Sequence, residues 1–180
     1  MLINAGGHLR GGQHFATAPP AAPSKAVTPT TTPPPWPDAH GPTGRRVHVE
    51  HLLEGNDFKE YVEERRGKGS GPELLVTKSV NSASYGTPNL DDWFKASGVT
   101  QVVLAGIQTN MCVETTARMG GNLGDDVLVA LDATHTFGLT GPNGWHLTAD
   151  ELARASAVSL HGGGFARVVT TGELVAVVRP

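Results

Sequence analysis

Short apolar runs alternate with longer amphipathic runs between about residue 45 and residue 171. The apolar residues are almost continuous in 101–106 and 126–132, as expected for strands that are covered on both faces. In 57–66, by contrast, Phe58, Tyr61 and Val62 recur at the spacing of a helix. The pattern predicts strands at 46–51, 73–78, 101–106, 126–132 and 166–171, and helices at 57–66, 89–98, 111–120 and 148–160.

This alternation predicts an α/β fold with an open, mostly parallel sheet and helices on both faces, a Rossmann-like three-layer sandwich. Thr148 followed by Glu151 fits a capping box at the start of the last long helix. Ligands of such sheets bind beyond the carboxyl ends of the strands. A functional site is therefore expected in a turn that leads from a strand into the next helix.

Composition separates residues 1–44 from residues 45–180. Eight of the 13 prolines lie between Pro19 and Pro37, in a stretch with little apolar surface to offset the entropy of ordering it. We expect residues 1–44 to be a disordered or polyproline-like segment, with a proline-rich ligand for a small recognition domain as the alternative. Residues 45–180 are expected to form one domain.

Charge and cysteine content exclude several classes of function. With 14 Lys and Arg against 17 Asp and Glu, the net charge of -3 provides no global field to hold nucleic acid or an anionic membrane. No run approaches the ~20 apolar residues of a membrane-spanning helix, and the first residues lack the order of a secretory signal. One cysteine excludes an internal disulfide and a multi-cysteine zinc site. We expect a soluble cytoplasmic protein.

That cysteine, Cys112, is placed where a helix begins after the strand at 101–106. A thiol there meets the positive end of the helix dipole and the free N–H groups of the first turn, which favour the nucleophilic thiolate. The alternative is that Cys112 is a small buried apolar residue. Its position alone leaves both interpretations open.

Two segments resemble motifs of a known enzyme family. GIQTNMCVETTAR, at 106–118, closely resembles the nucleophile motif of the isochorismatase-like cysteine hydrolases, which include nicotinamidases and N-carbamoylsarcosine amidase. TKSVNSASYGTPNLDDWFKASGVTQVVLAG, at 77–106, resembles the lysine segment of the family. RRVHVEH and DVLVALDATHTF are similar to its second strand and to the strand and loop after the nucleophile helix. The resemblance covers about residues 45–171 and implies an isochorismatase-like fold.

The resemblance implies a role for individual residues. Cys112 would attack an amide-type carbonyl, and Lys78 would supply positive charge near the thiol. A cis peptide between Ile107 and Gln108 would aim the backbone N–H of Gln108, together with that of Cys112, at the oxyanion. Weaker candidates for substrate binding in the same motifs are Thr109, Asn110 and Tyr85. For Thr109 and Asn110, capping of the helix is the alternative.

The resemblance also implies a reaction, which is hydrolysis of a C–N bond in a small amide-type substrate through a thioester. It implies a small-molecule substrate, a homo-oligomer and no cofactor. The alternative is a catalytically inactive or truncated relative that serves as a small-molecule-binding or scaffold module.

The third catalytic residue of the family, an aspartate at the end of the first strand, has no counterpart here. The first 37 residues contain no acidic residue. Either residues 1–4 are a remnant of that strand with Asn4 in place of the acid, or the strand lies upstream of residue 1. Both interpretations predict that the N-terminal strand, which lies in the middle of the sheet in the family, is missing or degraded. The missing base predicts slow hydrolysis of the thioester, unless His48 substitutes.

A metal site is a minor alternative. Asp38 and His40, with His48 and His51 further on, resemble the Asp-x-His metal site of nicotinamidases. The flanking PPPWP is not the strand that the family uses, and the strand at 46–51 already accounts for the last two histidines. We therefore expect no divalent metal. His135 and His161 are expected to be turn or loop residues rather than bases.

Overall fold

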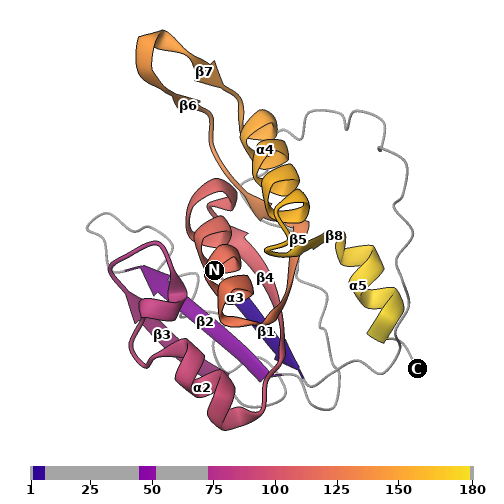
Figure 1. Ribbon diagram of the computed structural model, residues 1–180. Helices are drawn as coiled ribbons and strands as arrows, with labels where there is room; N and C mark the ends of the chain where they lie inside the picture. Colours follow the sequence, from indigo (N-terminus) through magenta and orange to yellow (C-terminus); the bar gives the residue numbers. More distant parts are fainter. Residues whose placement is uncertain (1, 7–44, 52–72, 179–180) are drawn as a thin grey trace.

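Six strands form one sheet in the order β3-β2-β1-β4-β5-β8 (Figure 1). The computed structural model describes residues 2–6, 45–51 and 73–178. The strands are β1 (Leu2–Gly6), β2 (Arg45–His51), β3 (Glu73–Lys78), β4 (Gln101–Ile107), β5 (Asp126–His135) and β8 (Arg167–Val169). All except β1 run in one direction, because β1 is antiparallel to both β2 and β4 while the remaining pairs are parallel.

Helices follow the strands in the order that the sequence predicts. They are α2 (Leu90–Ser97), α3 (Glu114–Leu123), α4 (Ala149–Gly162) and α5 (Thr171–Val178), and a π-helical turn, η2 (Thr109–Val113), leads into α3. The capping box of Thr148 and Glu151 is confirmed at the start of α4. The predicted α/β fold with a mostly parallel sheet is therefore confirmed. The helix expected at 57–66 lies outside the described residues.

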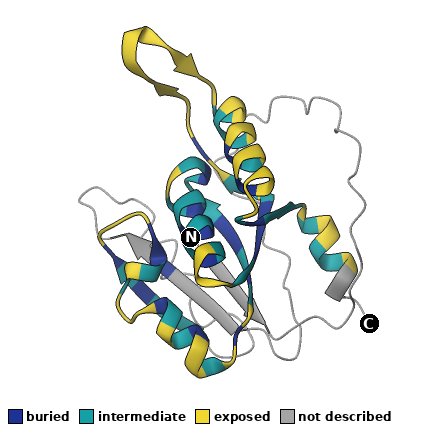
Figure 2. Ribbon diagram, in the orientation of Figure 1, coloured by how far each residue is buried: buried dark blue, intermediate teal, exposed yellow. Residues whose placement is uncertain are grey.

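Two parts of the fold that follow β5 were not predicted from the pattern. One is α5, and the other is a hairpin of β6 (Leu139–Thr140) and β7 (His146–Leu147). The hairpin extends away from the sheet beyond the N-terminal end of α4, and its surface is exposed (Figures 1 and 2). Polar and apolar residues do not alternate regularly in its two short strands, so the sequence pattern does not predict them.

The central position of the sheet is occupied by β1, in the reverse direction. Asn4 pairs with Arg46 on β2 and with Val103 on β4, well before the end of β4 at Ile107. Asn4 is therefore not at the carboxyl edge of the parallel strands, and the hypothesis that it stands in place of the family acid is wrong. Five residues of the segment at 1–44 belong to the sheet; residues 7–44 lie outside the described residues.

The core lies between the sheet and the helices that carry the motifs. Val76, Leu104 and Val129 are buried on β3, β4 and β5. The helices cover them with apolar residues such as Leu90 of α2, Ala117 of α3 and Leu160 of α4. Figure 2 shows this burial as dark blue along β4 and β5. Each valine or leucine of this core stabilises the fold by roughly 1.5–3 kcal/mol when fully buried. In the described part of the chain, no helix is long and apolar enough to cross a membrane.

Candidate functional site

The carboxyl ends of β3 and β4 bring together the two residues expected to carry the chemistry. Lys78 is the last residue of β3, and Cys112 lies in η2, directly after β4. The Lys78 Nζ atom is 3.3 Å from the Cys112 Sγ atom, although 34 positions separate the two residues in the sequence. Parallel strands end at one edge of the sheet, and this shared edge produces the contact.

Lys78 is held in place by its surroundings. It is 3% exposed, and its Nζ atom also donates to the backbone oxygen of Val80 at 2.8 Å. Burial lowers the pKa of Lys78, while the charge of Cys112 and the hydrogen bond to it raise that pKa again in part. Because burial and its two hydrogen-bond acceptors hold the Lys78 ammonium in one position, its positive charge acts on the Cys112 sulfur at a fixed distance.

One residue beside the thiol, Asn81, was not predicted from the sequence. Cys112 is half-buried, and its Sγ atom lies 3.8 Å from the Oδ1 atom of Asn81 as well as near Lys78. Asn81 belongs to the loop that follows β3, within the lysine segment. The only feature of the sequence that indicates this position is that Asn81 follows Lys78 by three residues.

The turn that carries Cys112 has the backbone that the resemblance implied. The peptide bond between Ile107 and Gln108 is cis. The carbonyl oxygen of Gln108 accepts hydrogen bonds from the backbone nitrogens of Met111 at 3.2 Å and Val113 at 3.1 Å. Gln108 therefore begins the turn on which Cys112 lies.

Thr109 and Asn110 connect this turn to the end of β5. Thr109 is 1% exposed, and its hydroxyl donates to Thr134 Oγ1 at 2.9 Å. The Oδ1 atom of Asn110 accepts from the hydroxyl of Thr136. The alternative that these two side chains cap the helix is wrong, because Gln108 precedes η2 and no side chain caps it.

The loop after β3 is shaped by close backbone contacts. Thr77 and Thr87 exchange backbone hydrogen bonds of 3.0 and 2.8 Å. A Cβ atom at Gly86 would lie 2.2 Å from Val76 Cγ1, so only glycine fits there. Tyr85 is 67% exposed on the short helix η1 (Ala83–Tyr85). Its part in substrate binding stays a prediction.

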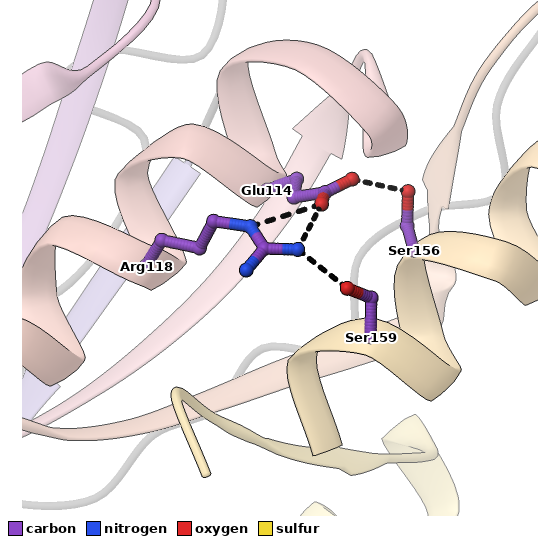
Figure 3. Close-up of polar contacts among 4 residues, drawn as sticks. All are labelled: Glu114, Arg118, Ser156 and Ser159. Carbon is purple, nitrogen blue, oxygen red and sulfur yellow. Dashed lines mark hydrogen bonds and ion pairs between the residues drawn. The ribbon is translucent and has the colours of Figure 1, made fainter. Parts of the chain in front are cut away.

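An ion pair within α3, immediately after the nucleophile turn, is hydrogen-bonded to two serines of α4 (Figure 3). Glu114 accepts from Arg118 Nη2 at 2.7 Å and from Ser156 Oγ at 2.5 Å, and Arg118 Nη2 donates to Ser159 Oγ at 2.6 Å. Arg118 also lies over the ring of Phe165, 4.7 Å from its centroid. The acidic residue closest to Cys112 in the sequence is therefore engaged with α4 rather than with the thiol.

Other acidic side chains in the described part of the chain are also bonded elsewhere. The pairs are Asp91 with Lys95, Asp126 with Arg167, Asp132 with Thr171, Glu151 with Thr148, and Glu173 with Thr170. Among the side chains that the structure describes, which do not include His48, Glu50 or His51, no three His, Cys, Asp or Glu residues gather to hold a metal ion. Asp38 and His40 also lie outside the described residues.

The chain is similar to known proteins of the family that the two sequence motifs resemble. Residues 18–160 match the family model of the isochorismatase domain. The isochorismatase family protein YrdC of Bacillus subtilis is 39% identical over 122 residues, which are 68% of this chain and 62% of that protein. Nicotinamidase 3 of Arabidopsis thaliana is 32% identical over 138 residues, covering 77% of this chain and 63% of that enzyme.

Among the solved structures that are similar to this chain is that of an isochorismatase-family protein from Chromobacterium violaceum. It has a TM-score of 0.60 and 29% identity, over 73% of this chain and 69% of that chain. The chain spans less than two thirds of the length of the two curated relatives, 62% and 63%. The family model covers most of the 180 residues, including the buried lysine and the cysteine turn. The chain belongs to the isochorismatase family.

Proposed function

We propose that this chain is a cysteine hydrolase that cleaves the C–N bond of a small amide-type substrate. The observation that carries the proposal is the 3.3 Å contact between the buried ammonium of Lys78 and the sulfur of Cys112. A cation at that distance favours the thiolate, the form of cysteine that attacks carbonyl carbon. The likeness to nicotinamidase 3, which is named for an amide substrate, supports the substrate class.

In the first step, the Cys112 sulfur forms a bond to the carbonyl carbon of the amide. The C–N bond then breaks, and the nitrogen leaves as ammonia or an amine with the proton that the thiol gave up. The product on the enzyme is a thioester. Half-burial of Cys112 leaves its sulfur within reach of a small molecule.

The negative charge that develops on the carbonyl oxygen would be stabilised by two backbone groups. The N–H groups of Gln108 and Cys112 lie at the two ends of one short turn, which follows the cis peptide at Ile107. Backbone donors that are held in position before the reaction stabilise an oxyanion without reorganisation, and one such donor is worth roughly 3–4 kcal/mol. The Lys78 ammonium adds a positive charge 3.3 Å from the Cys112 sulfur.

The second step is hydrolysis of the thioester by water, which restores the thiol and releases the carboxylic acid. It needs a base to accept a proton from water, and help of this kind is typically worth about 10²–10⁴-fold in rate. Lys78 cannot accept a proton while it is charged. The balance between the two steps therefore decides whether the thioester accumulates or turns over.

The experiment is to incubate the 180-residue chain with nicotinamide and a small panel of amides. Amine release and the intact mass of the protein are measured together. We expect either turnover or an acyl adduct on Cys112, and neither in Cys112→Ala. Lys95→Ala serves as the control for Lys78→Ala, because the Lys95 ammonium is exposed and pairs with Asp91 at 2.6 Å. Equal activity in the two lysine variants would contradict the role of Lys78.

A second candidate function is a binding or scaffold module without catalysis. It is favoured by the finding that the hydrogen-bond partners of Lys78 and Cys112 include no acidic side chain among those that the structure describes. In that case the panel would give saturable binding with neither an adduct nor amine release. The same incubation, followed by calorimetry, distinguishes the two functions.

A further inference from the structure

Lys78 and Asn81 both contact the sulfur of Cys112, but they differ in hydrogen-bonding character. The Lys78 Nζ atom, 3.3 Å from the sulfur, can only donate while it is charged. The Oδ1 atom of Asn81, 3.8 Å from the sulfur, can only accept. A substrate at the sulfur therefore meets a positive charge from one side chain and a hydrogen-bond acceptor from the other.

The two side chains also differ in their access to solvent. Lys78 is buried, whereas Asn81 is exposed on the loop that follows β3. Its neighbour Val80 is 46% exposed, and Met111, next to Cys112 in the sequence, is 36% exposed. A small molecule reaches a half-buried sulfur from the solvent side. Asn81 is therefore accessible to a substrate that approaches Cys112.

Ionisation of Cys112 changes what Asn81 can bond to. A neutral thiol donates its hydrogen to the Oδ1 atom of Asn81, but a thiolate has no hydrogen to donate. The Lys78 ammonium favours the thiolate. In the reactive state, the Oδ1 atom has therefore lost its bond to the thiol and can accept a hydrogen bond from a substrate.

The described histidines do not supply this acceptor. The ring of His135 packs edge-on against Phe137, with the centroids 5.0 Å apart. The Nδ1 atom of His161 accepts from the backbone nitrogen of Val168 at 3.5 Å. His135 ends β5 and His161 lies in α4, so the expectation that both are turn or loop residues is wrong.

An amide offers the hydrogen that Asn81 lacks. The carbonyl carbon of a bound substrate lies about 3–3.5 Å from the attacking sulfur, and the amide nitrogen is one covalent bond away from that carbon. An acceptor 3.8 Å from the sulfur is therefore within hydrogen-bonding distance of an N–H on that nitrogen. An ester of the same acid has an oxygen in this position and no hydrogen to donate.

From these contacts we infer that Asn81 is a specificity-determining residue, whose Oδ1 atom accepts a hydrogen bond from the N–H of the scissile amide and so favours amides over esters. The inference rests on the proposed function. Asn81 neither gives nor takes a proton. The sulfur of Cys112 bonds to the carbonyl carbon, the C–N bond breaks, and the nitrogen leaves with the proton that the thiol gave up.

A different role for Asn81 would be to stabilise the thiolate through its Nδ2 atom. The side-chain amide of asparagine is a donor at the nitrogen and an acceptor at the oxygen. As a donor to the sulfur, Asn81 would affect every electrophile that reacts with Cys112. As an acceptor, it affects only substrates that carry an N–H. Amides and esters of one acid therefore separate the two roles.

The experiment uses the full chain with two matched pairs of substrates, nicotinamide with methyl nicotinate and benzamide with methyl benzoate. Within each pair the same acyl group is transferred to Cys112, so hydrolysis of the thioester is shared and kcat/KM compares the first step. The variant is Asn81→Leu, which has a similar size and no hydrogen-bonding group. Ser79→Ala, at an exposed position of the same loop, is the control.

We expect Asn81→Leu to lower kcat/KM for the amides by roughly 3–10-fold, the typical effect of losing one hydrogen bond. The value for the esters should stay nearly unchanged, and Ser79→Ala should keep the wild-type preference. Asn81→Asp keeps an acceptor, so it should retain the preference for amides. Its negative charge disfavours the thiolate and should lower the values for amides and esters alike.

Alkylation of Cys112 by iodoacetamide gives a measurement that involves no substrate. Asn81→Leu should react at the wild-type rate, because Lys78 still contacts the sulfur. The same result shows that the site is folded in the variant. If thermal unfolding shows that Asn81→Leu does not fold, Asn81→Ala is used for the same comparison.

Each outcome has a defined meaning. An unchanged preference for amides in a folded Asn81→Leu chain would overturn the inference while the proposed function stands. Equal losses for amides and esters, together with slower alkylation, would do the same and would assign Asn81 to the thiolate. A wild-type chain that forms no adduct with the amides and releases no ammonia would overturn the proposed function itself, and the inference with it.

Discussion

At the scale of single residues, the site consists of a buried lysine that touches a half-buried thiol. Lys78 is 3% exposed and has two acceptors, the carbonyl oxygen of Val80 and the sulfur of Cys112. Removing an ammonium group from water is unfavourable, and burial accordingly lowers the pKa of Lys78. The arrangement places charge where the chemistry needs it, at some expense of stability. Both consequences can be measured.

The first prediction concerns reactivity at pH 7. Replacing Lys78 with Ala should slow alkylation of Cys112 by iodoacetamide by roughly tenfold or more, because only the thiolate reacts and the nearby cation favours it. The rate is followed by intact mass. Lys95→Ala, which removes an exposed ammonium paired with Asp91, should react like wild type. Equal rates in all three chains would contradict this role of Lys78.

The second prediction concerns stability. The pKa of Lys78 is lower in the folded chain than the ordinary 10.5, so the unfolded chain binds more protons at this group. The resulting destabilisation is complete at pH values below the folded-state pKa and disappears as the pH rises towards 10.5.

Lys78→Met should therefore raise the thermal midpoint at pH 7 by a few degrees, although it removes the functional charge. The advantage of the variant over wild type should shrink as the pH increases. Thermal unfolding at several pH values between 7 and 10 tests this. A midpoint below that of wild type at pH 7 would mean that the hydrogen bond to Val80 outweighs the burial of charge.

At the scale of elements, helix α3 is held between the nucleophile turn and α4. The hydroxyl groups of Thr134 and Thr136 bond to the turn. Glu114 and Arg118 pair within α3, and their hydrogen bonds to Ser156 and Ser159 connect the first turns of α3 to α4 (Figure 3). These contacts join β5, α3 and α4 around one cysteine. At Gly121, α3 also closely approaches the backbone of the connection between α4 and β8.

The third prediction is tied to that approach. A Cβ atom at Gly121 would lie 2.3 Å from the carbonyl oxygen of Phe165, and a backbone atom cannot move aside easily. Gly121→Ala should lower the free energy of unfolding by about 1–3 kcal/mol, which is typical of overpacking. The neighbouring Asn122→Ala, at an exposed position of α3, is the control for helix propensity. Comparable thermal midpoints in the two variants would show that the approach is looser than described.

At the scale of the whole molecule, the unusual feature is the direction of the central strand. Leu2–Gly6 pairs with β2 on one side and β4 on the other, antiparallel to both (Figure 1). Without it, the two neighbours would each leave a row of backbone groups unpaired at the middle of the sheet. The sheet is therefore continuous only because these five residues close the gap.

The fourth prediction tests this closure. Proline at position 3 cannot donate to the ladder and is not tolerated in a central strand. Ile3→Pro should lower the thermal midpoint by several degrees, because a buried carbonyl without a partner costs about 1–3 kcal/mol. Ile3→Val, which keeps the backbone, should have a small effect. An unchanged midpoint in the proline variant would mean that β1 contributes little to the fold.

Much of the fold could be predicted from local pattern. The nearly continuous apolar runs at 101–106 and 126–132 are strands, and Thr148 with Glu151 begins α4 as expected. Cys112 could be assigned a position at a helix start, and Lys78 was identified by resemblance to its family segment. Asn81 and the hairpin were missed because such short segments have no periodicity to detect. Helix α5 was missed because its apolar residues, at 174–178, are continuous rather than spaced at the period of a helix.

By itself the sequence determined the parallel strands and their helices, because periodic burial and capping act over a few residues and leave a local record. Only the tertiary structure decided what lies between β2 and β4 and which residues meet at their ends. Strand direction and register depend on pairing between distant segments, and no local pattern reports them. Asn4 therefore lies in mid-strand, and His51 is in register with Lys78.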